Sequence, residues 1–406
     1  MRRRTLLSAL GTGVGAITLG NMRKTRAAEI PGVTATEIRI GNTMPYSGIG
    51  SDFGVIGRGD AAYFRMINDQ GGINGRMIHF ISLDDSYTPP KTVEQTRRLV
   101  EQDQVAFIFN GLGTAPGSAV RPYLNHEHVP QLFLMTGADK WGNFQQFPWT
   151  LGWQPSYRTE AQIYAKYILA NRPDAKIALF WQNDDWGKDF VTGVKDVLSE
   201  RFDRMVVRSV SYEATDPTVD SQVVAMQSSG ADTVVSATAS VKLAQAVRKM
   251  HGLGWKPLHL VSNNAASIGG VLRPAGIENV IGIITAGYLK DPNSPEWADD
   301  PGMNAWRAFM SKYLPDADTT NSLYVYAYGV SMTLVQVLRQ CGDDLTRANI
   351  MRQAANLHDL EIPVLLPGIR VNTNPTNYHP IRQMQLQRFD GERWQRFSEL
   401  IEGSEA

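Results

Sequence analysis

The sequence predicts an α/β protein built from two doubly wound parallel sheets. Short runs of strand-forming residues alternate along the chain with amphipathic helical patterns, which is typical of repeated βα units. Some runs are apolar throughout, for example Ala106–Phe109 and Ile177–Trp181, as expected for strands buried on both faces of a parallel sheet. The chain has 406 residues, of which 43% are hydrophobic and 20% charged, enough for two domains with separate cores.

The elements follow in order from these patterns. The expected strands are Glu37–Gly41, Met77–Leu83, Val105–Asn110, Gln131–Leu134, Lys176–Trp181, Met205–Val210, Thr233–Ala237, Leu258–Val261 and Val280–Ala286. The helices between them are expected at Gly54–Gln70, Lys91–Gln102, Gln162–Leu169, Phe190–Ser199, Ser221–Ser228 and Lys242–His251. In the first helix Ile56, Tyr63, Phe64 and Ile67 share one face, and the glycine pair at 71–72 is typical of a helix end.

Two seams interrupt the alternation, near Phe147–Ser156 and near Ile283–Pro295. After the second seam the chain is strongly helical, with helices expected at Trp297–Tyr313, Ser322–Arg339 and Arg347–Leu357. Strands are expected again at Gly368–Val371, Ile381–Phe389 and Arg393–Phe397, and Asp390-Gly391 predicts a hairpin between the last two.

The first 28 residues read as an export signal. They hold six basic residues and no acid, so the rest of the chain has 34 basic and 40 acidic residues, or a formal charge of −6. Arg2, Arg3 and Arg4 precede a weakly apolar run, and Ala27-Ala28 offers a cleavage site, with cleavage preferred after Ala27. The segment resembles a twin-arginine signal, which predicts a periplasmic protein; the alternative is an uncleaved basic amphipathic tail. A mildly acidic body argues against nucleic acid as a partner.

The signatures of metal, nucleotide and nucleophilic chemistry are missing. The sequence has no His-Glu-x-x-His motif, no cysteine pair, no phosphate-binding loop and no Gly-x-Ser-x-Gly elbow. Cys341 is the only cysteine, so no internal disulfide can form. The loop Gly111–Gly117 only faintly resembles a dinucleotide fingerprint, because Pro116 stands where its last glycine would be. We therefore expect no metal and no cofactor.

Small and polar residues follow four of the expected strands. They lie at 44–48, 111–117, 136–139 and 262–264. Open α/β sheets bind ligands at the carboxyl ends of their strands, and glycines at a helix start expose backbone N–H groups that suit a carboxylate. Any one of these loops could be a simple tight turn, but four together predict a binding cleft.

These residues resemble the type I periplasmic solute-binding proteins of ABC transporters, in the leucine/isoleucine/valine-binding branch. The motifs that carry the resemblance are Pro45-Tyr46-Ser47-Gly48, Phe53-Gly54, Ile67–Arg76 with its Gly-Gly-Ile-Asn-Gly, Asp84-Asp85, Gly152–Pro155 and Asn183–Phe190. The resemblance extends from about Thr36 to Phe397 and implies two lobes joined by a three-strand hinge, the third crossover lying near Glu361–Pro367. It places lobe I at 29–150 plus 285–360 and lobe II at 151–284 plus 361–406, after the signal at 1–28.

The resemblance also implies a ligand site. Gly111, Thr114, Gly137 and Asp139 match first-lobe positions that hold an amino acid's carboxylate and amine, while Phe53 and Trp186 match aromatic residues that cover its side chain. Without the family, core packing would be the simpler role for both aromatics. Asp139 departs from the family's small hydroxyl residue; it would repel a carboxylate, attract an amine, or cap the next turn. At the position of Asn264 the family has an acid, which pairs with the ammonium group of the ligand. The side-chain amide of Asn264 cannot neutralise that charge. The resemblance also places Tyr157 and Ala239 near the cleft.

The function expected from these observations is capture of a small solute by lobe closure and its delivery to ABC permease subunits in the inner membrane. An amino acid, a short amide or an aromatic acid would fit, and a monomer without covalent chemistry is expected. Two alternatives stay open: a ligand-sensing receptor subunit with the same fold, and a secreted α/β enzyme. The second would need a nucleophile–base pair that the sequence does not display.

Overall fold

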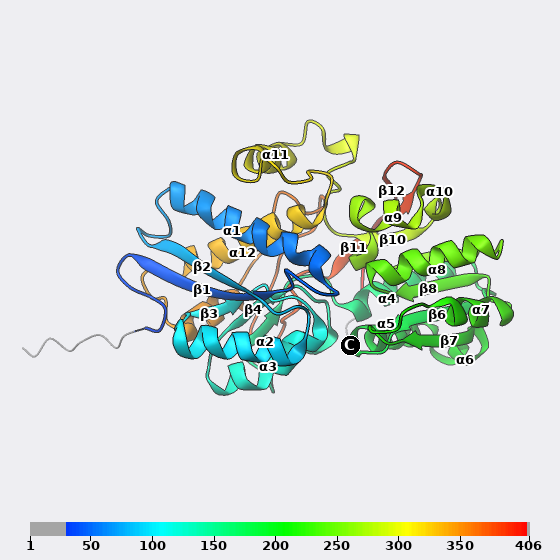
Figure 1. Ribbon diagram of the computed structural model, residues 1–406, viewed down its shortest axis with the longest axis horizontal. Coiled ribbons are helices and arrows are strands. Elements are labelled where there is room, and N and C mark those ends of the chain that lie inside the picture. Colours follow the sequence, from blue (N-terminus) through cyan, green and yellow to red (C-terminus); the bar gives the residue numbers. More distant parts are fainter. Residues whose placement is uncertain (1–29, 404–406) are drawn as a thin grey trace, which may run out of the picture.

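The computed structural model describes residues 30–403, so the export-signal prediction falls outside the described residues. The chain forms two halves side by side, each a sheet covered by helices on both faces (Figure 1). This confirms the predicted α/β fold with two doubly wound lobes. In the part of the chain that is described, no helix is both long and apolar enough to cross a membrane.

The first sheet is parallel throughout and has the strand order β2-β1-β3-β4-β5. Its strands are β1 (Glu37–Met44), β2 (Met77–Asp84), β3 (Phe107–Phe109), β4 (Gln131–Leu134) and β5 (Thr150–Gly152). The long helices of this half are α1 (Gly54–Asp69), α2 (Pro89–Arg97), α3 (Thr114–His126), α11 (Pro301–Tyr313), α12 (Leu323–Gln340) and α13 (Arg347–Ala354). In Figure 1, α1 and α12 lie on one side of this sheet, with α2 and α3 on the other.

The second sheet has the order β12-β11-β10-β9-β8-β6-β7. Its strands are β6 (Ile177–Gln182), β7 (Val206–Tyr212), β8 (Thr233–Ala237), β9 (Leu258–Val261), β10 (Ile284–Gly287), β11 (Gln383–Phe389) and β12 (Trp394–Glu402). The main helices are α4 (Tyr157–Asn171), α5 (Asp185–Leu198), α7 (Asp220–Ser228) and α8 (Ser240–Gly252), with short α6 (Phe202–Met205), α9 (Arg273–Ala275) and α10 (Ile277–Val280). Strands β11 and β12 pair antiparallel, which confirms the predicted hairpin at Asp390-Gly391.

The chain passes between the two halves three times. It leaves the first sheet after Gly152, leaves the second after Gly287, and returns to the second at Gln383. Trp153 anchors the first crossing: it is fully buried, and its indole Nε1–H donates to Thr333 Oγ1 at 3.0 Å. Buried, hydrogen-bonded indoles are hard to displace, so the crossing is fixed at a defined point.

Four predicted features differ from the structure. Gly368–Val371 forms no strand and contributes only an isolated bridge between Leu360 and Val371. Val280 ends helix α10 instead of starting a strand, and β5 occupies part of the predicted seam. Helix α4 begins earlier than predicted because the Ser156 hydroxyl caps it by accepting the Thr159 N–H at 3.1 Å.

Candidate functional site

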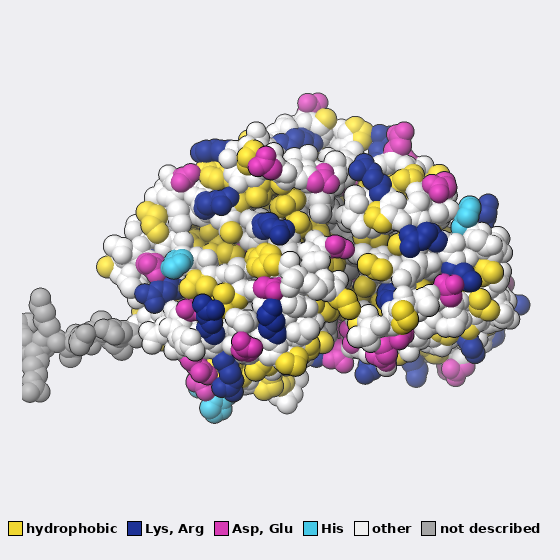
Figure 2. All heavy atoms as spheres, in the orientation of Figure 1, with side chains coloured by type: hydrophobic (Ala, Val, Ile, Leu, Met, Phe, Trp, Pro, Cys, Tyr) yellow, Lys and Arg dark blue, Asp and Glu magenta, His cyan; other side chains and the backbone are white. Residues whose placement is uncertain are grey.

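A cavity of about 300 Å³ lies where the carboxyl ends of the two sheets face each other. The two halves meet there along a furrow in the surface, and acidic and basic side chains are scattered over both without a patch of one sign (Figure 2). The cavity brings together residues from both halves of the chain. Six of the residues predicted to bind ligand line it, namely Phe53, Thr114, Tyr157, Trp186, Ala239 and Asn264.

Aromatic side chains form most of the cavity wall. Phe53 stands just before α1, Tyr87 follows β2, and Tyr212 ends β7. Tyr157 and Trp186 begin α4 and α5, and their ring centroids are 5.6 Å apart with 40° between the planes. Five aromatic rings in one cavity favour a ligand with a flat, apolar body, because offset and tilted ring contacts add to the gain from area burial.

The start of α3 provides hydrogen-bond donors to the cavity. Gly113 and Thr114 line it, and no side chain caps this helix. The first N–H groups of a helix have no hydrogen-bond partner within the helix. In α3, Pro116 has no N–H group, and the Gly117 N–H donates to the Gly113 carbonyl at 3.0 Å. The N–H groups of Thr114, which lines the cavity, and of Ala115, which is exposed, have no hydrogen-bond partner among the described residues. Gly113 has a φ of 98°, and a Cβ there would lie 2.6 Å from the Tyr87 ring, so only glycine fits.

Hydrogen bonds fix the second-half residues around the cavity. The Asn264 side-chain amide donates to the Tyr157 hydroxyl at 2.9 Å, and the Ala239 N–H donates to the Tyr212 hydroxyl at 2.9 Å. Burial raises the pKa of Tyr157 to about 12, so its hydroxyl stays neutral. These two hydrogen bonds orient the Tyr157 and Tyr212 hydroxyl groups before a ligand binds.

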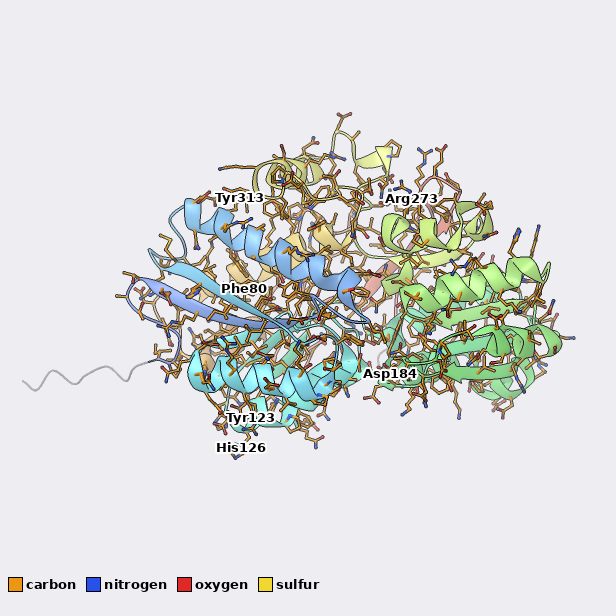
Figure 3. All side chains as sticks on the ribbon, viewed as in Figure 1. Phe80, Tyr123, His126, Asp184, Arg273 and Tyr313 are labelled. Atoms are coloured by element: carbon orange, nitrogen blue, oxygen red, sulfur yellow. The ribbon has the colours of Figure 1, made fainter. Side chains whose placement is uncertain are left out.

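The charged residues of the cavity are unevenly partnered. Asp184 caps α5: one carboxylate oxygen accepts the Gly187 N–H at 3.2 Å and the other accepts the Gln182 amide at 2.7 Å. Burial raises the pKa of Asp184. Figure 3 shows Asp184 at the junction of the two halves. Asp52 is exposed, whereas Asp216 is half-buried and its carboxylate accepts the Glu213 N–H at 2.9 Å.

Three predicted ligand residues do not line this cavity. Gly111 lies beside a separate small cavity on the other side of its strand end, near Thr43. Gly137 accepts the Tyr157 N–H at 2.6 Å through its carbonyl, and a Cβ there would lie 2.4 Å from the Pro155 carbonyl oxygen. Its role is to let the first crossing pass close to β4.

Asp139 is the third, and it turns away from the cavity. Its carboxylate accepts the Ser156 hydroxyl at 2.9 Å and pairs with Arg158 at 3.4 Å. The nearby His379 Nε2 lies 3.7 Å away, and the Asp139 N–H donates to Asp189 at 2.8 Å. These contacts tie the first half of the chain to α4 and α5.

Sequence reasoning missed several residues of the cavity. Tyr87, Gln182 and Tyr212 all stand at or just beyond the carboxyl ends of parallel strands, so the rule that found the other loops would have found them. Lys242 and Gln245 lie on α8, where a charged or polar residue looks like ordinary helix surface. No sequence signal marked them.

The site has no feature of a metal centre. Within residues 30–403 no group of three or more His, Cys, Asp or Glu side chains is arranged to hold a metal ion. The lone Cys341 is buried, and burial raises the pKa of its thiol to about 12, so the thiolate is scarce at neutral pH.

Comparisons with known proteins agree with this geometry. A sequence profile of the periplasmic binding protein family matches residues 37–393. The Leu/Ile/Val-binding protein homolog 1 of Brucella abortus is 24% identical over 327 residues, covering 76% of this chain and 80% of that protein.

Two solved structures have the same fold. A branched-chain amino acid ABC transporter protein of Thermus thermophilus with bound valine superposes with a TM-score of 0.81 at 15% identity, over 92% of this chain and 98% of that one. A solute-binding protein of an ABC transporter from Rhodopseudomonas palustris, in complex with 3,4-dihydroxybenzoic acid, gives 0.73 at 16% identity, over 91% and 98%. The chain therefore belongs to the periplasmic binding protein family, in the type I group that includes the Leu/Ile/Val-binding proteins.

Proposed function

We propose that this protein is the periplasmic solute-binding subunit of an ABC transporter and that its ligand is a small aromatic carboxylic acid. The observation that carries the proposal is the pairing of a five-ring aromatic cavity with the uncapped start of α3. In this proposal the carboxylate accepts the N–H groups of Thr114 and Ala115, where the helix dipole also favours a negative charge. The ring lies between Phe53 and Trp186.

The cavity favours an acid without an amine. An amino acid needs a carboxylate for its ammonium group, and burying that group unpaired would cost several kcal/mol. The Asp184 carboxylate caps α5 and holds the Gln182 amide, the half-buried Asp216 carboxylate accepts the Glu213 N–H, and Asp52 is exposed. Asn264 is neutral and donates to Tyr157. Two structural neighbours, one with bound valine and one with 3,4-dihydroxybenzoic acid, indicate that this fold accommodates both classes.

Ligand capture in this proposal is lobe closure without covalent chemistry. Both halves contribute to the cavity, so a ligand that bridges them stabilises the closed arrangement over the open one. The closed protein would then dock on permease subunits in the inner membrane, after export that the basic N-terminus favours.

The test is native mass spectrometry of the purified mature protein, followed by a thermal-shift screen. Benzoate and 4-methylbenzoate should raise the unfolding midpoint, and at about 100 times Kd the gain in stability is about 2.7 kcal/mol. Valine and leucine should not, and the acid should be recovered chemically unchanged. Stabilisation by the amino acids alone would refute the aromatic-acid assignment, and conversion of the acid would refute the binding function.

A further inference from the structure

Lys242 is a buried cation in the cavity wall without an acidic partner. It lies in the first turn of α8, is 7% exposed, and its Nζ donates to the backbone carbonyl of Asp216. Among the described residues it forms no ion pair. Lys290 is buried to the same degree, but its Nζ lies 2.7 Å from the Asp300 carboxylate and also donates to the Pro363 carbonyl.

Lys242 thus has only one acceptor, whereas Lys290 has two, one of them a carboxylate. An ammonium group has three N–H donors and no acceptor, so it can bind up to three acceptors. A buried charge is costly unless it is both paired and hydrogen-bonded. One backbone carbonyl leaves most of that requirement unmet for Lys242. Since the side chain lines a ligand cavity, the missing partner has room to arrive with the ligand.

A second donor of the same wall is also without a partner. Trp186 is 7% exposed, and its indole Nε1–H makes no hydrogen bond in the described structure. An unpaired buried donor costs about 1–3 kcal/mol. Lys242 and Trp186 both belong to the second half, whereas the start of α3 belongs to the first.

The acids near Lys242 do not remove this demand. Asp216 offers its backbone carbonyl, while its half-buried carboxylate accepts the Glu213 N–H and forms no ion pair with Lys242 among the described residues. Asp184 is engaged with Gln182 and Gly187, and Asp52 is exposed.

We infer that Lys242 binds a second carboxylate of the ligand, so that the substrate class is an aromatic dicarboxylate. This inference rests on the proposed function and deepens it. One carboxylate meets the N–H groups at the start of α3, the ring lies between the aromatic walls, and the other carboxylate pairs with the Lys242 ammonium. Trp186 supplies a further N–H along this path.

The experiment compares benzene-1,4-dicarboxylate with 4-methylbenzoate by isothermal titration calorimetry. The two acids share the ring and the first carboxylate, and a methyl group replaces the second. We expect the wild-type protein to bind the dicarboxylate at least tenfold more tightly. Lys242→Met should abolish that preference, so that the variant binds the two acids equally, while Lys242→Arg should retain most of it.

The matched control is Lys249→Met, on the same helix. Lys249 pairs with Asp220 at 3.1 Å and does not line the cavity, so both affinities should stay unchanged. Equal wild-type affinity for the two acids, or a preference that survives Lys242→Met, overturns this inference and leaves the proposed function standing. Failure of both acids to bind refutes the proposed function as well.

Discussion

Replacing Glu160 with glutamine should change how the stability of this protein depends on pH. Glu160 lies on α4 and is 3% exposed. One carboxylate oxygen accepts the Tyr164 hydroxyl at 2.6 Å and the Asn263 N–H at 2.5 Å, and the other accepts the Ser262 hydroxyl at 3.3 Å. The group thus holds the loop that carries Asn264 into the cavity. Glutamine can keep all three contacts, because the Ser262 hydroxyl can also accept.

The sign follows from the pKa of the carboxyl group. Burial raises the pKa of Glu160 to about 7 in the folded protein, against about 4.3 in an unfolded chain. Between these values the folded state binds more protons than the unfolded state, so stability falls as pH rises. A difference of about 2.7 pKa units at 1.36 kcal/mol each gives a total of roughly 4 kcal/mol, of which roughly 2–3 kcal/mol is lost between pH 5 and pH 8.

The assay is urea denaturation of wild type and Glu160→Gln at pH 5 and pH 8. The variant cannot ionise at this position, so its loss of unfolding free energy over that interval should be smaller by roughly 2–3 kcal/mol. Asp60 is also fully buried, and burial raises its pKa to about 8, but it is present in both proteins and cancels in the comparison. Equal losses in the two proteins would refute the reasoning.

Three further outcomes are expected. Phe53→Ala and Trp186→Ala should each weaken binding of 4-methylbenzoate at least tenfold in calorimetry, about 1.4 kcal/mol, with a cooperative unfolding transition retained; unchanged affinity in both removes the aromatic wall from the site. Lys140→Ala breaks the ion pair that Lys140 forms with Asp185 across the two halves. The unliganded variant should therefore have a larger radius of gyration in solution scattering, and its affinity for 4-methylbenzoate should be a few-fold weaker. An unchanged radius of gyration would show that this ion pair has no role in closure. Asp139→Ser should lower the thermal midpoint and leave affinity unchanged; tighter binding would show that Asp139 faces the ligand.

The sequence was informative about the fold because burial leaves a strong pattern. Strands enclosed on both faces are apolar without interruption, as Ile177–Trp181 illustrates, and this run became β6. Because the buried strands could be recognised, the loops that follow their carboxyl ends could be located as well. Thr114 falls in one of these loops, whereas Trp186 was assigned through the family resemblance; both line the cavity.

Side-chain direction was harder to predict than position. Asp139 lies in a loop of the expected kind, yet its direction is set by Ser156 and Arg158, which reach it from the next helix. Lys242 shows the opposite case: a lysine on an amphipathic helix is usually solvated, and only the packing of the 213–217 loop against α8 buries it. Contacts between separate segments decide both outcomes, and such contacts have no local sequence pattern.

The charge on the second half of the cavity decides the ligand class. The resemblance to amino acid-binding relatives implies an acid at the position of Asn264, where it would pair with the ligand ammonium. Here that position is neutral and engaged with Tyr157, and the same wall holds the buried cation of Lys242 as well as the half-buried carboxylate of Asp184. In the proposed binding mode an acid pairs with the Lys242 ammonium, whereas an ammonium ligand would meet like charge there. On this proposal, exchange of an acid for a base on one wall reverses the preferred charge of the ligand while the fold stays the same.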